Sequence, residues 1–580
     1  MKTFLVIILA LLATLSSGCG DKHLISNTEY RNSIEKSFKE RKQLAKFRQA
    51  ELFSVFDKPL SIHQEEALKF MFAFMPLSDL ADYDGDFFLA NVDISLRART
   101  EATWGKDIPE EIFLHYVLPC RVNNENLDSF RLVYYDEILN RVKGKGMKEA
   151  ALEINHWCHE KVSYQPADIR TSAPISTILS ARGRCGEEST FTVAALRTAG
   201  IPARQVYTPR WAHTDDNHAW VEIWFQGEWF YMGACEPEPV MDRGWFTEPA
   251  RRAMMIHTKS FGAYLGNENY ITRQNNFTLV NNLAKYALTK RIFVKVLDGT
   301  GAPVNNAQVE YQLYNYAEFY PVAVVPADEN GISQLETGFG DLLIWAHNGN
   351  NFDYKKISVN DTDTLILKLS GKAEGNYSLD VDLDVPVVRP PLTIPASEMI
   401  EQNAGRIADE NIIRQKYTDS WMNAEAARTL ALGLKIDTAR TIKIIERSMG
   451  NYKEIVSFIS GTSDSLKQFA LSMLEILPDK DLRDAKSNIL TDHLKNCYRP
   501  SGLNSDVGFN TYLNYVLNPR IANENLVSWR SYFLKTIPAQ LITEVRKDPL
   551  LIVKNLDENI IIRNDENYYK TPLTPRGVYE

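Results

Sequence analysis

The strongest chemical signal in the sequence is a cysteine and a histidine, each placed where a predicted element begins. Cys185 lies in the glycine-rich segment 182–189, directly before a helical pattern of apolar residues that ends near Gly200. His218 opens the apolar run 218–225. A thiol with an imidazole base beside it is a nucleophile for a carbonyl carbon. The pair therefore predicts covalent catalysis on an amide or an ester.

The element that must position the thiol is a helix beginning at or just after Cys185. Unpaired backbone N–H groups at a helix N-terminus favour an anion. We therefore expect the pKa of the Cys185 thiol to lie below about 8.5, the ordinary value for cysteine. The same N–H groups are expected to stabilise an oxyanion formed by attack on the carbonyl.

The element that must position the base is a strand over 218–225, followed by a turn and a returning strand over 229–232. A third group usually orients a catalytic imidazole. Glu236 and Glu238 come just after the returning strand, so we expect Glu236 to accept a hydrogen bond from His218. Glu238 is the second candidate for this role.

Residues from about 147 to 245 resemble the transglutaminase-like superfamily of papain-like thiol enzymes. The matching pieces are Tyr164, segments 183–187, 199–204 and 218–222, and Trp229 before an acidic-proline step. The resemblance implies a catalytic triad in which Cys185 is the nucleophile and His218 the base. The third residue of the family is normally an Asp close behind the Trp. Here the acid is substituted and displaced to Glu236.

The N-terminus predicts export and a lipid anchor. Lys2 precedes an apolar run, and small residues precede Cys19. This is the pattern of a signal peptide over 1–18, and it is too short to favour a permanent membrane span. The small residues before Cys19 resemble a bacterial lipobox, which implies cleavage there and lipidation of Cys19. We expect a protein of the bacterial cell envelope, periplasmic or on the outer-membrane surface, held to a membrane by this lipid.

Composition is that of an ordinary globular protein, and the 580 residues are too many for one domain. The net charge of −9 argues against nucleic acid as a partner. The cysteines are scattered and include no Cys-x-x-Cys pair, so they predict neither a disulfide framework nor a zinc ribbon. His156 and His159 lie on an amphipathic helical pattern, where a solvated edge is favoured over a metal site. We expect no cofactor and no metal.

Residues 285–372 predict an antiparallel β-sandwich, because short alternating strands are separated by Asp/Asn-Gly turns. This segment resembles the carboxypeptidase-regulatory-like or Cna-B-like modules of secreted proteins, and we expect a spacer or packing role for it. Residues 373–397 are proline-rich and predict an extended linker.

The chain contains an internal repeat. Residues 116–131 match 515–530 at ten of sixteen positions, and Asp79-Leu80 upstream matches Asp481-Leu482. We infer two related helical domains, over 19–145 and 398–580, with the shared polar residues forming a buried network. They flank the catalytic domain over 146–275 and the sandwich. The fold class predicted is multidomain α+β, with a papain-like transglutaminase core.

The function predicted is that of a secreted thiol hydrolase, a peptidase or amidase, acting on a protein or peptide. Two alternatives stay open: an acyl transferase that cross-links proteins, and a catalytically inert binding or assembly lipoprotein. The sequence does not indicate the oligomeric state.

Overall fold

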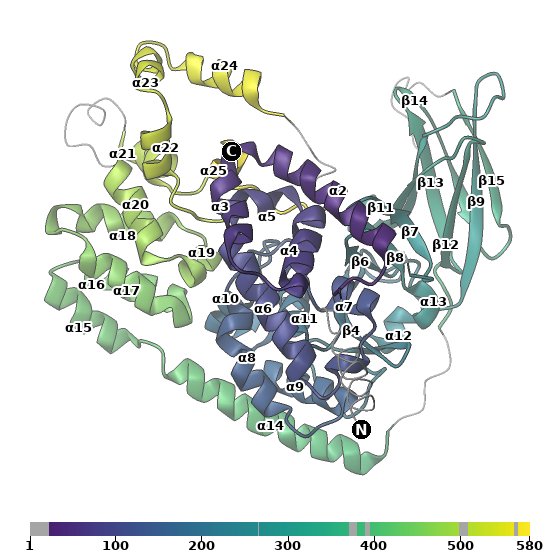
Figure 1. Cartoon of the computed structure of the whole chain (residues 1–580), viewed down its shortest axis with the longest axis horizontal. Helices are drawn as coiled ribbons and strands as arrows, with labels where there is room; N and C mark the ends of the chain where they lie inside the picture. Colours follow the sequence, from purple (N-terminus) through teal and green to yellow (C-terminus); the bar gives the residue numbers. More distant parts are fainter. Residues whose placement is uncertain are drawn as a thin grey trace, which may run out of the picture.

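The computed structural model describes residues 23–264, 266–370, 380–388, 395–497, 508–561 and 567–579. The predicted signal peptide and Cys19 lie outside the described residues, as does most of the predicted linker. Figure 1 shows a central body, with the β-sandwich on one side and the C-terminal helices on the other. Within the described ranges, no helix combines the length and apolar character needed to cross a bilayer.

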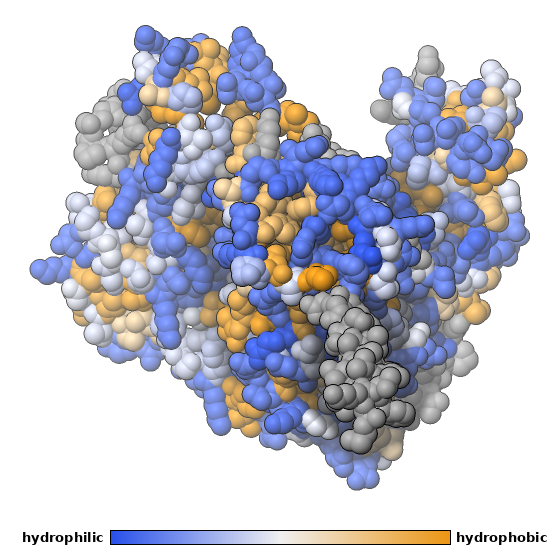
Figure 2. Space-filling view, in the orientation of Figure 1, coloured by the Kyte–Doolittle hydropathy of each residue, from blue (hydrophilic) through white to orange (hydrophobic). Residues whose placement is uncertain are grey.

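The N-terminal part is helical, and its surface helix α2 is strongly hydrophilic (Figure 2). Its elements are α2 (Thr28–Leu44), η1 (Lys46–Arg48), α3 (Gln49–Phe53), η2 (Ser54–Asp57), α4 (Ile62–Phe74), α5 (Leu77–Asp82), α6 (Gly85–Glu101), η3 (Gly105–Asp107), α7 (Glu110–Tyr116) and α8 (Phe130–Arg141). Helix α4 begins with a capping box between Ser61 and Gln64, and almost all of its second half is buried.

The part of the chain predicted to be catalytic, called the catalytic part below, combines helices with a six-stranded antiparallel sheet of order β5-β4-β3-β6-β8-β7. Its helices are α9 (Met147–Lys161), α10 (Pro174–Ser180), α11 (Cys185–Thr198), α12 (Thr247–Ala250) and α13 (Leu283–Tyr286). The sheet strands are β3 (Ala203–Thr208), β4 (His218–Phe225), β5 (Glu228–Met232), β6 (His257–Phe261), β7 (Tyr270–Arg273) and β8 (Phe277–Asn281). A separate two-stranded parallel pair joins β1 (Ser163–Tyr164) and β2 (Arg182–Gly183). The sheet therefore continues past the predicted boundary at residue 275.

The N-terminal helices and the catalytic part share one hydrophobic core. The core includes Phe70 and Phe113 of the helices together with Phe191 of α11 and Val221 of β4. Because the apolar faces of these elements bury one another, the N-terminal helices are part of the structure that supports the site and have no separate core.

The β-sandwich has sheets of order β11-β10-β13-β14 and β12-β9-β15, packed around a core that also takes in Met254, Met255 and Ile271 from the preceding part of the chain. Its strands are β9 (Thr289–Asp298), β10 (Gln308–Asn315), β11 (Glu318–Pro326), β12 (Ile332–Gly338), β13 (Asp341–Asn348), β14 (Asn351–Ser358) and β15 (Thr364–Leu369). The sequence interpretation missed β12. It also missed that β15 runs parallel to β9, whereas the other pairings are antiparallel.

A long helix, α14 (Ser397–Asp419), runs along the lower edge of the molecule in Figure 1 and leads to the C-terminal helices. These are α15 (Ala424–Leu434), α16 (Thr438–Ser448), η4 (Met449–Asn451), α17 (Tyr452–Gly461), η5 (Asp464–Leu466), α18 (Lys467–Ile476), α19 (Asp479–Asp484), α20 (Ser487–Cys497), α21 (Phe509–Tyr512), η6 (Leu513–Leu517), α22 (Arg530–Thr536), α23 (Ala539–Val545), α24 (Leu550–Asn559) and α25 (Pro575–Tyr579). The helices from α15 to η6 surround a third core.

The two copies of the repeat form the same polar network. In the first copy, Arg121 pairs with Asp79 and donates to the Glu125 carbonyl, and the Glu125 carboxylate accepts two backbone N–H groups at 2.7 and 2.8 Å. In the second copy, Arg520 pairs with Asp481 at 2.6 Å and donates to the Glu524 carbonyl. The Glu524 carboxylate likewise accepts two backbone N–H groups, both at 2.7 Å. The shared residues therefore hold a loop to a short helix in both copies.

The end of the chain returns to the first core. Tyr568 is buried there, stacks on Phe277 with ring centroids 4.9 Å apart, and donates its hydroxyl to the Phe74 carbonyl at 2.7 Å. Thr574 donates to Asp82 at 2.5 Å. The segment predicted as one C-terminal domain therefore contributes to two cores.

Candidate active site

Cys185 is the first residue of α11, as the sequence predicts. The carboxylate of Glu187 folds back and accepts the backbone N–H of Arg184 at 3.0 Å, which closes the start of the helix. Gly183 is required by this geometry, because a Cβ at that position would lie 2.8 Å from the Glu187 Cβ. The glycine-rich turn thus lets Glu187 hold the helix start that carries the thiol.

His218 is the first residue of β4, and the strand brings it to Cys185. In the sheet, His218 pairs with Thr208 and Ala219 pairs with Tyr207 of β3. The Ala219 backbone N–H donates toward the Cys185 sulfur and lowers the pKa of the thiol. The structure therefore places the thiol against the backbone of the residue that follows the histidine. No hydrogen bond joins the Cys185 sulfur to the His218 ring in the part of the chain that the structure describes.

The electrostatics of the pair favour the neutral forms. Burial raises the pKa of the Cys185 thiol, and the Ala219 N–H and the Arg184 charge only partly oppose this shift. Burial lowers the pKa of His218 to about 3. The expectation that the helix N-terminus lowers the thiol pKa is therefore wrong, because removal of the sulfur from water outweighs the effect of nearby N–H groups.

Aromatic rings enclose the His218 imidazole. Ring centroids lie 5.7 Å away for Trp220, 4.6 Å for Trp245 and 4.9 Å for Phe246. The Nε2 atom is buried and has no hydrogen-bond partner among the described residues. An imidazolium would be poorly solvated here, so the site requires a further group to accept a hydrogen bond from Nε2 if the ring is to take a proton.

Glu236 lies close to this pocket but is bonded to another residue. Its Oε2 atom accepts a hydrogen bond from Trp245 Nε1 at 3.0 Å. Burial raises the pKa of Glu236 to about 7. The predicted hydrogen bond between Glu236 and His218 is absent from the described contacts, and the Trp245 ring touches both partners instead.

The backbone explains how a displaced acid reaches the site. Cys235 adopts a left-handed conformation, with φ of 54°, and turns the chain directly before Glu236. A Cβ built on Gly233 would lie only 3.2 Å from the Glu236 Oε2 atom. The Glu236 carboxylate therefore lies beside position 233, which is four residues after Trp229. The family resemblance predicts the acid close behind this tryptophan.

The second candidate acid is engaged elsewhere, since Glu238 accepts a hydrogen bond from Arg243 Nε at 2.9 Å. This contact leaves Glu236 as the nearer of the two to the aromatic pocket. Cys120, which lies in the first copy of the repeat, is a free thiol whose pKa is raised by burial to about 11.

Sequence reasoning missed Trp245 and Glu188 as residues of the site. Trp245 is 57 % exposed, its ring packs against His218, and its Nε1 donates to Glu236. The only sequence signal for this role is its position next to Phe246, after the acidic-proline step. Glu188 is buried, with Oε1 unpartnered among the described residues, and burial raises its pKa well above the usual range. Tyr164, 55 % exposed, lies at the mouth of the site, where Cys185 and acidic groups add to the effect of burial and raise its pKa.

The histidine pair on α9 contacts α14. Nδ1 of His156 and Nδ1 of His159 lie 2.7 and 2.8 Å from the two carboxylate oxygens of Glu410. The described residues include no group of three or more His, Cys, Asp or Glu side chains arranged to hold a metal ion. The pair thus attaches the long helix to the catalytic part.

Comparisons with known proteins identify the central segment. Residues 136–234 match the model of the Transglutaminase-like superfamily, a range that contains Cys185 and His218 and ends just before Glu236. No curated protein matches. Among solved structures, the chain is similar to a candidate cysteine protease from Cytophaga hutchinsonii, at 19% identity and a TM-score of 0.17. That similarity covers 26% of this chain and 58% of the other.

Proposed function

We propose that this protein is a thiol enzyme that attacks an amide or ester carbonyl through Cys185 and works as a hydrolase on a protein or peptide. The observation that carries the proposal is the placement of Cys185 at the start of α11, against the His218-Ala219 backbone of β4. The match of residues 136–234 to the Transglutaminase-like superfamily supports the same chemistry.

The mechanism starts from a neutral thiol and a neutral imidazole. His218 takes the thiol proton as the sulfur attacks, and the tetrahedral oxyanion forms near backbone N–H groups at the start of α11. Collapse of this intermediate expels the leaving amine or alcohol, which receives the proton from His218. Water activated by the same imidazole then hydrolyses the thioester and releases the carboxylic acid.

Glu236 is the proposed orienting acid for His218. Because Oε2 of Glu236 is bonded to Trp245 in the resting structure, the catalytic hydrogen bond from His218 Nε2 either goes to Oε1 or follows release of the Trp245 indole. Trp245 is more than half exposed, so a substrate that packs on its ring is able to displace it. A carboxylate at Nε2 would fix the tautomer and stabilise the imidazolium.

A second candidate function is that of an inert binding or assembly protein. The raised thiol pKa, the lowered imidazole pKa and the buried Nε2 without a described partner all favour a site that does not turn over. The two candidates differ in a simple property, since only an enzyme needs Cys185 to form a covalent bond with a substrate-like electrophile.

We further propose that the mature chain begins at Cys19 and is anchored by lipid to a membrane of the cell envelope. The sequence before this residue supports the proposal. A lipid chain gains about 0.8 kcal/mol per buried CH₂, so it holds the protein to a membrane surface without a spanning helix. Mass spectrometry of the membrane-bound protein should find acyl groups on Cys19, and an unmodified Cys19 would contradict this proposal.

The test of the enzymatic proposal is covalent trapping. The mature protein is incubated with a panel of peptides that carry a vinyl sulfone, and the labelled peptide is identified by mass spectrometry. We expect labelling at Cys185, and its loss in Cys185→Ala and His218→Ala variants that remain folded. Incubation of unmodified peptides with and without a primary amine then separates hydrolysis from acyl transfer, since transfer gives a new amide. Equal labelling of wild type and His218→Ala would favour the inert protein.

A further inference from the structure

The C-terminal helices contribute a buried cation to the start of the nucleophile helix. Lys480 of α19 is 6 % exposed, although its position in the sequence is far from the catalytic segment. Its Nζ atom lies 2.9 Å from Glu187 Oε1 and 3.0 Å from Asp168 Oδ1. It also donates to the backbone carbonyls of Asp168, at 2.9 Å, and Arg170. A lysine surrounded by four acceptors is held in one place.

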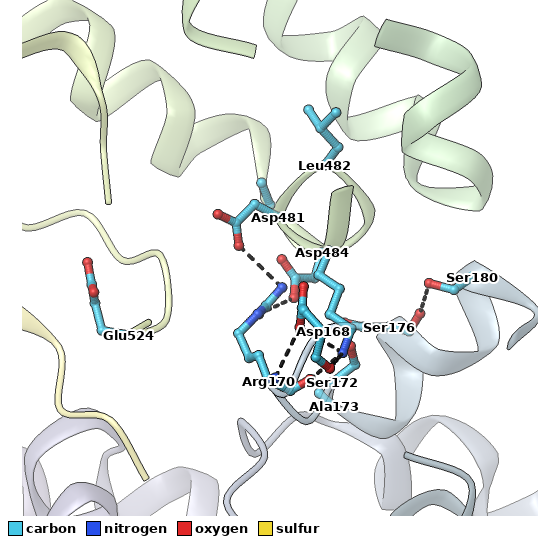
Figure 3. Close-up of polar contacts among 12 residues, drawn as sticks. Asp168, Arg170, Ser172, Ala173, Ser176, Ser180, Asp481, Leu482, Asp484 and Glu524 are labelled. Carbon is cyan, nitrogen blue, oxygen red and sulfur yellow. Dashed lines mark hydrogen bonds and ion pairs between the residues drawn. The ribbon is translucent and has the colours of Figure 1, made fainter. Parts of the chain in front are cut away.

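The loop that receives Lys480 also supports the helix start from the other side. Arg184 donates to the carbonyls of Asp168 and Ile169, with distances of 3.0 and 2.5 Å. Arg170 extends away from the site and pairs with Asp481 at 3.2 Å and Asp484 at 2.8 Å, both on α19 (Figure 3). The loop therefore lies between α19 and the residue that precedes the thiol.

Glu187 needs a cation. Its carboxylate is almost fully buried, accepts the Arg184 backbone N–H, and lies 3.4 Å from the Arg184 guanidinium and 2.9 Å from Lys480. A buried carboxylate without a partner is strongly unfavourable. Its negative charge, two residues from the nucleophile, also opposes formation of the Cys185 thiolate. A cation fixed on Glu187 therefore helps both the fold of the helix start and the chemistry of the thiol.

The comparison of the two repeat copies shows that this contact belongs to the second copy alone. The residue that corresponds to Lys480 in the first copy is Ser78, which bonds to Asp79 on its own helix at 3.5 Å. The first copy contacts the opposite end of α11 instead, where Arg197 donates to the carbonyls of Pro119 and Arg121, both at 3.0 Å. The two copies thus hold the nucleophile helix at its two ends, and only the second supplies a charge to it.

We propose that Lys480 is a positioning residue of the active site, which compensates the Glu187 carboxylate and so keeps Cys185 reactive. The proposal rests on the proposed function of Cys185 as a nucleophile. It makes the C-terminal helices a working part of the catalytic site.

The test follows alkylation of Cys185 by iodoacetamide at pH 8, with the modified residue identified by mass spectrometry in the full mature chain. We expect Lys480→Met to lower the rate about tenfold, the effect of a one-unit rise in thiol pKa. Lys480→Arg should restore most of the rate, since it returns a cation. Lys486→Met is the matched control, because this exposed lysine of the same domain pairs only loosely with Glu454, at 3.8 Å, and should leave the rate unchanged.

A double variant keeps the test decisive if Lys480→Met folds poorly. Glu187→Gln with Lys480→Met replaces the ion pair by two neutral groups. The Cys185 alkylation rate of this double variant should lie within about threefold of the rate of Glu187→Gln alone, because the effect of residue 480 acts through residue 187. The proposal would be overturned if Lys480→Met were alkylated as fast as wild type. It would also be overturned if Lys480→Met lowered the alkylation rate by the same factor in the wild-type chain and in Glu187→Gln. Alkylation of Cys185 needs no substrate. If the protein turned over no substrate but Lys480→Met still slowed alkylation about tenfold, the result would count against the proposed enzymatic function and not against the role of Lys480.

Discussion

At the scale of single residues, the site holds its proton on the thiol. Burial acts in opposite directions on the two partners, raising the pKa of Cys185 and lowering that of His218. A thiolate–imidazolium pair would titrate differently, because it is present only at pH values above a low thiol pKa and below a higher imidazole pKa. Reactivity of the free protein therefore depends on pH in a way that separates the two arrangements.

The first prediction concerns this pH dependence. Between pH 5 and pH 8 the alkylation rate of Cys185 should rise about tenfold per pH unit, because the thiolate fraction rises in that proportion below the thiol pKa. The measurement is the iodoacetamide rate at the Cys185 peptide, with Cys185→Ala as the blank. A flat rate across this range would instead mean that a thiolate–imidazolium pair is already formed.

The second prediction concerns Glu236. Its pKa of about 7 means that the carboxylate form is lost as the pH falls through neutrality, so labelling by the peptide probe should fall with it. Glu236→Gln should slow labelling at pH 8 by as much as about 10⁴-fold, the loss of rate that follows removal of the orienting acid from a catalytic triad. It should also remove the inflection near pH 7.

The control for Glu236 is Glu238→Gln, which breaks the contact with Arg243 and should label like wild type. If the two variants behaved alike, Glu236 would have no special role in the reaction.

At the scale of elements, much of the site follows from the sequence. The glycine-rich turn before Cys185 and the apolar run after His218 predict a helix start and a strand start, and α11 and β4 begin at those residues. The bond between Trp245 and Glu236 was not predictable, because it depends on a left-handed turn at Cys235 and on a loop whose path is set by tertiary packing. Strand β12 was missed because its two apolar residues, Ile332 and Leu335, are three positions apart and so lack the alternation that predicts a strand.

The third prediction concerns the turn that positions the nucleophile. Gly183→Ala places a Cβ 2.8 Å from the Glu187 Cβ, so the side chain that closes the helix start must move. We expect a loss of about 1–3 kcal/mol in the free energy of unfolding, as for other overpacked sites. Alkylation of Cys185 should slow in parallel. Denaturant unfolding and the alkylation rate measure the two effects.

Gly433→Ala is the matched control for this turn. Gly433 lies within α15, and a Cβ there meets no heavy atom within 4 Å. Alanine should leave the free energy of unfolding unchanged or raise it by about 0.5–1 kcal/mol, because glycine is unfavourable in a helix. Equal destabilisation by the two substitutions would show that the clash with Glu187 is unimportant.

At the scale of the whole molecule, the four hydrophobic clusters of the described residues are joined by contacts that the sequence order does not suggest. The repeat predicted two related helical segments, and both form the same network of Arg, Asp and Glu. What the repeat could not show is that the first copy merges with the catalytic core, whereas the second keeps a core of its own and reaches the site through Lys480. Contacts between distant segments depend on how surfaces fit, which no local pattern records.

The fourth prediction concerns Tyr568. Its ring is buried against Phe277 in the core that holds the catalytic helix, so Tyr568→Ala should lower the free energy of unfolding by about 3–5 kcal/mol. The measurement is thermal or denaturant unfolding followed by tryptophan fluorescence. Tyr515→Ala is the control, since that side chain is 85 % exposed and should cost little. Similar losses for the two variants would mean that the returning segment does not support the first core.

The return of Tyr568 to the first core has a consequence for biosynthesis. Helix α4 leaves the ribosome well before Tyr568, whose hydroxyl bonds to the Phe74 carbonyl from 494 residues further along the chain and whose ring stacks on Phe277. This part of the core therefore stays incompletely packed until the segment that carries Tyr568 has been made. Helix α11 shares that core, so the final packing around Cys185 is completed only after a segment more than 300 residues further along the chain has folded back onto it.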